Sequence, residues 1–405
     1  MARSGTAQAA PTLAAAVKPI IQNTMLVPAT GAVARIIKLM APFPKWNSDS
    51  FRPARRAKRA GPTIPSDIAA RHGPIVVPAS PPITPAAATG QKRGASGMSR
   101  HVAVTTTTAP ASSARFARSA STMAYGLPHD LDIWSPRFLD RFAAFCAAVA
   151  RIVRDEGGAV PFYCPVNEIS FWAWAGGDHA RMHPNSFGRG PELKRQLARA
   201  VIRAIEAVRE VAPDARFVQA EPLIHVAGHP DMPETVAGAE AHRLAQFEAF
   251  DMIAGRLAPE LGGSEAHLDI VGVNFYPENQ LIRGGTTLPL GHWLYRPLRH
   301  LLAEVDARYG RPVLLSETGA EGSNGAGWLR HVGGEVCAAR RAGVPVQGIC
   351  LYPVMNYPGW QNDRLCQCGL IRSGGDWRER SCDQDLMDQV AEEQMLLAMA
   401  GAAGA

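Results

Sequence analysis

Two glutamates, Glu168 and Glu317, stand at the ends of short apolar runs that lie far apart in the sequence. The runs are residues 161–168 (PFYCPVNE) and residues 311–317 (RPVLLSE). Both are rich in aliphatic and aromatic residues and show no polar alternation, which is typical of buried parallel strands. A carboxylate at the carboxyl end of such a strand lies at the catalytic face of a β/α barrel. Two carboxylates that face each other there are what the hydrolysis of a glycosidic bond requires.

The segments that would position these carboxylates alternate between strand and helix from about Gly126 onward. Short apolar runs predict strands at 161–167, 216–220, 268–275, 312–316 and 346–351. Apolar residues at helical spacing predict helices at 136–156, 191–211, 241–257, 293–309, 328–342 (interrupted by a Gly-Gly pair) and 383–399. Such alternation predicts a parallel sheet. The expected fold class is α/β, a (β/α)8 TIM barrel that is incomplete: strands 4–8 are clear and strands 1–3 are missing or replaced.

The first 120 residues differ in kind from the rest. They hold 16 Lys and Arg against two acids, a net charge of +14, whereas residues 121–405 hold 26 Lys and Arg against 34 acids, a net charge of −8. This Ala-, Pro-, Arg- and Thr-rich composition predicts a low-complexity segment, disordered or translated from a shifted frame, before a barrel portion at 121–400. Basic clusters could also belong to a nucleic-acid arm or a targeting peptide, but neither is the preferred interpretation.

Several classes of function find no support in the sequence. Seven scattered cysteines indicate thiols in a reducing compartment, and we therefore expect a cytoplasmic protein. No apolar run of about 18 residues predicts a membrane span. The histidines lack metal-ligand spacing, and no GxGxxG or GxxxxGK[ST] sequence is present, so we expect no metal and no cofactor. The expected partner is a small-molecule glycoside, with neither nucleic acid nor membrane.

Three motifs resemble those of clan A retaining glycosidases, particularly the family 1 β-glucosidase-like enzymes. They are VNE at 166–168, GVNFY at 272–276 and LSET at 315–318. The resemblance covers residues 124–380 and implies a (β/α)8 barrel. The family's strand 3 histidine falls near Ala124, and Tyr352 stands where a tryptophan usually ends strand 8.

The resemblance also implies roles for individual residues. Glu168 matches the acid/base that follows an asparagine, here Asn167, at the end of strand 4. Glu317 matches the nucleophile that ends strand 7, and Tyr276 is expected to contact it. Asn167 is expected to donate to the sugar 2-hydroxyl, and Asn274 is expected to help bind the substrate. The implied reaction is retaining hydrolysis of a β-linked O-glycoside by double displacement.

Other side chains at the predicted rim admit more than one interpretation. Trp172 could stack on a sugar ring or pack within the rim, and Trp360 could form part of a sugar subsite after strand 8. Glu221 also ends a strand, where it could contact substrate or form a structural ion pair.

Two functions therefore compete. The first is a retaining β-glucosidase-like hydrolase. The second is a catalytically inactive glycosidase-like or sugar-binding protein, because the sequence does not supply three recognisable strands before residue 161. For the 405-residue chain the missing strands lead us to expect little or no turnover.

Overall fold

The computed structural model describes residues 25–28, 36–38, 127–128, 130–155, 162–359, 364–373 and 380–402. The central element is a seven-stranded sheet in the order β1–β9–β8–β6–β4–β3–β2. Five parallel strands lie where the sequence predicts them: β3 (Phe162–Cys164), β4 (Arg216–Pro222), β6 (Ile270–Asn274), β8 (Val313–Thr318) and β9 (Val346–Leu351). They follow one another across the sheet in chain order, as βαβ crossovers require.

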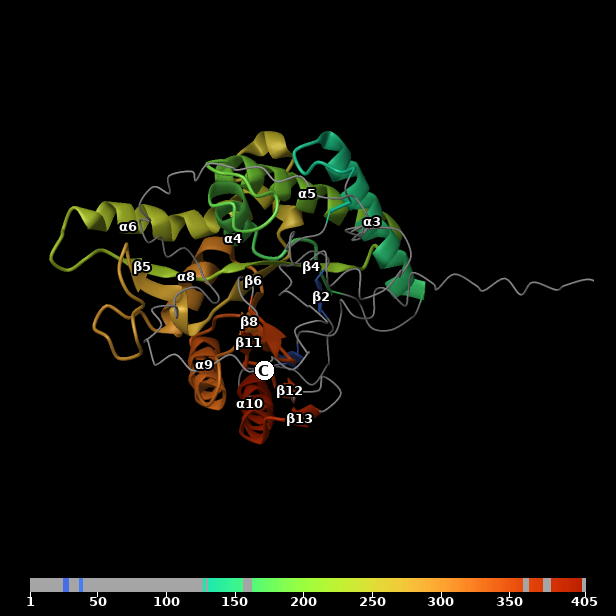
Figure 1. Ribbon diagram of the computed structural model, residues 1–405. Coiled ribbons are helices and arrows are strands. Elements are labelled where there is room, and N and C mark those ends of the chain that lie inside the picture. Colours follow the sequence, from blue (N-terminus) through green and yellow to red (C-terminus); the bar gives the residue numbers. More distant parts are fainter. Residues whose placement is uncertain are drawn as a thin grey trace, which may run out of the picture.

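Two short strands from the first 120 residues border the five. β2 (Ile36–Lys38) pairs in parallel with β3, and β1 (Met25–Pro28) pairs antiparallel with β9. In a closed barrel, strands 3 and 1 would take these places. The sheet curls into a half-barrel, and no pairing between β1 and β2 closes it within the described strands (Figure 1). The α/β fold class with an incomplete barrel is thus confirmed.

Long helices cover the outside of the sheet (Figure 1). They are α3 (Pro136–Asp155), α5 (Gly190–Val211), α8 (Leu298–Tyr309), α9 (Asn324–Arg341) and α10 (Gln384–Ala402). α3 packs on α5, and α10 packs on α9. The apolar residues predicted at helical spacing in α3 and α5, such as Phe138, Val149 and Leu197, are buried.

Shorter elements connect this framework. They are α4 (Ile169–Trp172), η3 (Ala173–Asp178), β5 (His225–Ala227), α6 (Thr235–Leu244), η4 (Ala245–Phe247), α7 (Glu248–Ile253), η5 (Pro259–Leu261), η6 (Glu265–His267), η7 (Pro277–Asn279), β7 (Gln280–Ile282), β10 (Tyr357–Pro358), β11 (Leu365–Cys366), β12 (Ile371–Ser373) and β13 (Arg380–Cys382). β5, α6 and β7 extend sideways from the sheet, at the left of Figure 1.

Three helix predictions need correction. The predicted helix 241–257 is broken by the turn η4. There the side chain of Gln246 accepts a hydrogen bond from the backbone amide of Ile224 and donates to the backbone carbonyls of Ile224 and Arg243. α8 begins only at Leu298, because Pro297 disfavours helical backbone in the residue before it.

The third correction concerns α9, which continues through Gly333 and Gly334 without the predicted interruption. A Cβ on Gly333 would lie within 1.8 Å of the Glu393 carboxylate on α10. Close packing against α10 therefore uses the small residue and offsets its helix-breaking tendency.

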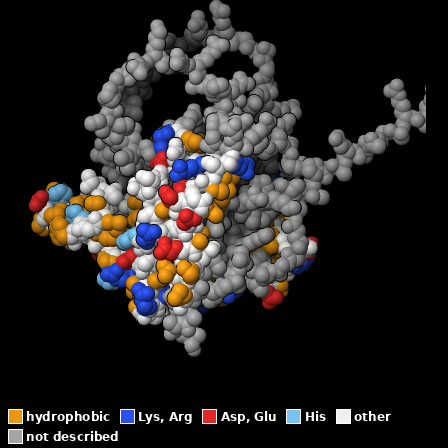
Figure 2. Space-filling view, turned by 90° about the horizontal axis from the view of Figure 1, so that it is seen from below, with side chains coloured by type: hydrophobic (Ala, Val, Ile, Leu, Met, Phe, Trp, Pro, Cys, Tyr) orange, Lys and Arg blue, Asp and Glu red, His pale blue; other side chains and the backbone are white. Residues whose placement is uncertain are grey.

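The surface carries charges of both signs. Figure 2 shows basic and acidic side chains interspersed on one face of the described residues. Within those residues, the helices are all too short or too polar to span a membrane.

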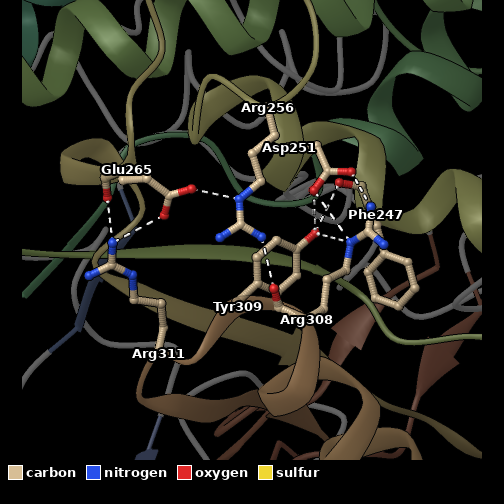
Figure 3. Close-up of polar contacts among 7 residues, drawn as sticks. All are labelled: Phe247, Asp251, Arg256, Glu265, Arg308, Tyr309 and Arg311. Carbon is tan, nitrogen blue, oxygen red and sulfur yellow. Dashed lines mark hydrogen bonds and ion pairs between the residues drawn. The ribbon is translucent and has the colours of Figure 1, made fainter.

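A polar network anchors α7 and α8 where α8 leads into β8 (Figure 3). The buried carboxylate of Asp251 accepts a hydrogen bond from the Tyr309 hydroxyl at 2.9 Å and forms an ion pair with Arg308. The Glu265 carboxylate accepts from both Arg256, at 2.6 Å, and Arg311, at 3.2 Å. Because these contacts lie at the amino end of β8, they are remote from Glu317, near its carboxyl end.

Candidate active site

Glu168 lies four residues beyond Cys164, the last residue of β3, at the start of the short helix α4. Its backbone is left-handed, with φ 54° and ψ 58°, a conformation that costs a non-glycine residue about 1–2 kcal/mol. Its amide nitrogen donates to the carbonyl of Ala220 on β4 at 2.8 Å, and the preceding residue, Asn167, forms a bridge with the same residue. The neighbouring strand therefore fixes the backbone on which this carboxylate is carried.

A single buried amide links the neighbourhoods of the two glutamates. Asn274, which ends β6 and is fully buried, donates through Nδ2 to Oε1 of Glu168 at 2.9 Å. Its Oδ1 accepts the hydroxyl of Ser316, the residue before Glu317, at 2.6 Å. Asn274 Nδ2 also lies 3.4 Å from Oδ1 of Asn167. The structure thus brings together Asn167, Glu168, Asn274 and Glu317 at the carboxyl ends of β3, β6 and β8, with β4 between β3 and β6.

A register shift between β6 and β8 sets this arrangement. Val273 lies opposite Leu315, but the next residue, Asn274, lies opposite Glu317, so Ser316 is the extra residue on β8. Such bulges redirect side chains beside functional sites. Beyond the shift, the amide of Phe275 donates to the carbonyl of Glu317 at 2.9 Å and holds the end of β8 in place.

Glu317 is buried and accepts a hydrogen bond from Tyr276. The Tyr276 hydroxyl lies 2.9 Å from Oε2 of Glu317. Burial, followed by the negative charge of Glu317 and weaker effects from Tyr352 and Glu168, raises the pKa of Tyr276 well above 10. The hydroxyl therefore remains protonated at neutral pH and stays a donor. The negative charges of both Glu317 and Glu168 therefore act on the Tyr276 hydroxyl.

Tyr352, just after β9, completes this side of the site. Burial, with Glu317 as the largest charge effect, raises the pKa of its hydroxyl well above 10. Its ring lies 6.1 Å from that of Tyr357. Sequence reasoning noticed Tyr352 only as a replacement for tryptophan and assigned it no function.

Of the two tryptophans predicted to bind substrate, the structure describes only Trp172. Trp172 is fully buried, and its indole N–H donates to the carbonyl of His183 at 2.6 Å, which supports packing within the rim over stacking on a sugar. Trp360 lies outside the described residues.

Sequence reasoning missed Asn279, three residues after Tyr276. Its side chain accepts from the amide of Tyr276 at 3.2 Å and donates to the carbonyls of Leu223 and Asn274. It thereby ties the loop that carries Tyr276 to the ends of β4 and β6. The Tyr-Pro start of a turn was the only signal in the sequence that pointed to this loop.

Glu221 makes contacts that neither interpretation from the sequence anticipated. Its carboxylate is fully buried and accepts from the backbone amides of Ile169 and Ser170 and from the side chain of Gln219. For metal binding, the described residues contain no group of three or more His, Cys, Asp or Glu side chains suited to one ion.

Comparison with known proteins finds a likeness in structure. No family model matches the chain, and no curated protein matches its sequence. A β-glucosidase from Thermotoga maritima in complex with deoxynojirimycin aligns with a TM-score of 0.55 at 17% identity, over 67% of this chain and 72% of that one. In fold, the chain is similar to β-glucosidases.

Two further β-glycosidase structures give the same result. The β-glycosidase from the hyperthermophile Thermosphaera aggregans has a TM-score of 0.53 at 15% identity, over 65% of this chain and 63% of that one. The hyperthermophilic β-glucosidase from Pyrococcus furiosus has a TM-score of 0.53 at 18% identity, over 66% of this chain and 62% of that one. The chain therefore spans less than two thirds of either of these β-glycosidases, and the likeness is one of fold.

Proposed function

We propose that the chain is a retaining O-glycosidase for β-linked glycosides, with Glu168 as general acid/base and Glu317 as nucleophile. The observation that carries this proposal is the position of Asn274, which bonds Glu168 on one side and the residue before Glu317 on the other. Two carboxylates so placed at the carboxyl ends of parallel strands suit double displacement. The β-glucosidase fold adds support but assigns no residue its role.

In the first step Glu317 attacks the anomeric carbon and the glycosidic C–O bond breaks. Glu168 transfers its proton to the departing oxygen, which leaves as an alcohol. The Tyr276 hydroxyl orients the attacking carboxylate through its 2.9 Å hydrogen bond. The product is a glycosyl ester of Glu317.

In the second step water attacks the same carbon and displaces Glu317. Glu168, now ionised, removes the proton of that water and returns to its starting state. Retention of configuration follows from the two inversions, and the mechanism requires the carboxyl groups to stand about 5–5.5 Å apart. Asn167 is the proposed donor to the sugar 2-hydroxyl, and Asn274 acts on the substrate through its hydrogen bond to Glu168.

The first prediction is that a slowly hydrolysed substrate traps the ester on Glu317. A 2-deoxy-2-fluoro glycoside with a dinitrophenyl leaving group forms the ester readily but loses it slowly, because fluorine destabilises the oxocarbenium-like transition state. Intact mass should rise by one fluoro-sugar, and peptide mapping should locate the sugar on Glu317.

The variants Glu317→Ala and Glu168→Ala provide the controls. Glu317→Ala should take up no label. Glu168→Ala should still be labelled, because a dinitrophenolate leaves without a proton. A label on another residue, or equal labelling of Glu317→Ala, would refute the assignment.

A sugar-binding protein without turnover is the second candidate, and the antiparallel edge of the described sheet favours it. β1 runs antiparallel beside β9, whereas a closed (β/α)8 barrel is all-parallel. If this candidate is right, deoxynojirimycin should bind in a calorimetric titration while no label and no hydrolysis are seen.

A further inference from the structure

Glu221 makes an unusual set of contacts for a fully buried carboxylate. It is the second-last residue of β4 and lies opposite Val273 of β6. Oε1 accepts from the amide of Ile169 at 2.9 Å and from Nε2 of Gln219 at 3.1 Å, and Oε2 accepts from the amide of Ser170 at 2.9 Å. Three donors thus converge on one carboxylate.

The two amides are the first of helix α4, and they need acceptors. The first amides of any helix lack partners within it, and the side chain of the N-cap residue usually accepts from them. The N-cap of α4 is Glu168, whose side chain makes no capping bond. Its carboxylate accepts instead from Asn274. Glu221 therefore supplies from a neighbouring strand the cap that Glu168 does not provide.

The same contacts surround the strained backbone of Glu168. The amide of Glu168 bonds to Ala220, and the next two amides bond to Glu221. Left-handed backbone at a non-glycine residue persists where its surroundings determine it on both sides. Two consecutive residues of β4 thus hold three consecutive amides at the start of α4.

We infer that Glu221 is a positioning residue, which caps α4 in place of Glu168, so that the Glu168 carboxyl bonds Asn274 and reaches the substrate. This inference rests on the proposed function, in which Glu168 transfers the proton. It also explains a buried carboxylate at this rim that is neither the proposed nucleophile nor the proposed acid/base.

The proposed role requires a carboxylate and not merely a polar group of similar size. In Glu221→Gln, the amide oxygen can take the place of Oε1, where Ile169 and Gln219 donate. The new NH2 group would then face the amide of Ser170, donor against donor. The start of α4 should shift, and the Glu168 carboxyl with it.

The test compares two substrates in the full-length protein and in Glu221→Gln. A phenyl glycoside needs a proton from Glu168 to depart, whereas a 2,4-dinitrophenyl glycoside does not. We expect kcat/KM to fall about 10- to 100-fold for the phenyl glycoside and less than about threefold for the dinitrophenyl glycoside, as a small displacement of the acid predicts. A loss of folded protein would instead lower kcat/KM for both substrates by the same factor.

Azide provides a second measurement. Deglycosylation needs Glu168 to deprotonate water, so kcat for the dinitrophenyl glycoside should also fall in Glu221→Gln. Azide attacks the anomeric carbon, the bond to Glu317 breaks, and a glycosyl azide forms without any proton transfer. Added azide should therefore raise kcat in Glu221→Gln, together with the appearance of glycosyl azide.

Glu393→Gln is the matched control, because Glu393 is also buried but lies on α10 and accepts from Gln389 at 2.9 Å. In Glu393→Gln, kcat/KM should change by the same factor for both substrates, and azide should not raise kcat. Equal losses for the two substrates in Glu221→Gln, or no effect of azide, would overturn the positioning role.

The role of Glu221 can also be tested if the wild-type protein hydrolyses neither substrate. That result would reject the proposed function, and the inference about Glu221 would then be decided by NMR. Glu221→Gln should speed hydrogen exchange of the Ile169 and Ser170 amides at least about tenfold and shift the side-chain amide signal of Asn274, which reports the place of Glu168. Unchanged exchange and an unshifted Asn274 signal would reject the inference.

Discussion

At the scale of single residues, the site depends on donors that act on carboxylates. Tyr276 donates to Glu317, Asn274 donates to Glu168, and Ser316 fixes the orientation of Asn274 by bonding its oxygen. The bonds of Tyr276 to Glu317 and of Ser316 to Asn274 are buried, and the bond of Asn274 to Glu168 is partly buried. The loss of one donor therefore leaves its acceptor unsatisfied where little water can replace it.

Replacement of Tyr276 by Phe should lower kcat about 10- to 100-fold, because a hydrogen bond to a charged group is worth about 1.5–3 kcal/mol. Tyr309→Phe is the matched control. It also removes a buried tyrosine hydroxyl that bonds a carboxylate, that of Asp251, but far from the site. Steady-state kinetics should show a loss of kcat only for Tyr276→Phe, and equal losses would contradict its role.

At the scale of elements, the two ends of the sheet have different tasks. The carboxyl ends of β3, β6 and β8 carry the candidate site, whereas the network around Asp251 joins α7 to α8 at the opposite end (Figure 3). This division is typical of β/α barrels, in which one face serves catalysis and the other stability.

Asp251→Asn should therefore reduce the free energy of unfolding by about 2 kcal/mol, because the new amide leaves Arg308 without its anion. It should leave kcat unchanged. The control is Asp140→Asn, which breaks an exposed ion pair with Arg203 on the surface and should cost less than about 0.5 kcal/mol. Urea denaturation measures both, and equal effects would show that the network adds nothing beyond a surface ion pair.

At the scale of the whole molecule, partly buried histidines link stability to pH. Burial lowers the pKa of five histidines from the ordinary 6.5, in the case of His183 to about 4; the other four are His225, His242, His267 and His331. The folded protein holds these side chains neutral, whereas the unfolded chain binds protons below pH 6.5. Their contribution to stability is present above pH 6.5 and is lost as the pH falls towards 4.

The free energy of unfolding should consequently fall between pH 6.5 and 4, with about 3 kcal/mol of the loss due to His183. His183→Leu should flatten the pH dependence by that amount, while His300→Gln, at an exposed position, should leave it unchanged. Chemical denaturation at a series of pH values measures the slope. An unaltered slope in His183→Leu would contradict the assignment.

Two predictions about the whole molecule, its location and its division into segments, remain untested. The cytoplasmic location stays a prediction from the sequence, in which seven cysteines are scattered; six of them are buried in the structure. The division into a low-complexity segment at 1–120 and a barrel portion at 121–400 also stays a prediction, with the two short strands β1 and β2 as the part of the first segment that the structure describes.

The sequence by itself determined the five parallel strands and the ends of β3 and β8 at which Glu168 and Glu317 lie. Apolar runs and helical spacing are local properties, so a single chain reveals them without knowledge of its neighbours. Only the tertiary structure decided the register shift that sets Asn274 opposite Glu317, the capping of α4 by Glu221 and the burial of Trp172. Each of these depends on contacts between segments about 10 to 50 residues apart, and no local pattern encodes which partner a buried polar group will find.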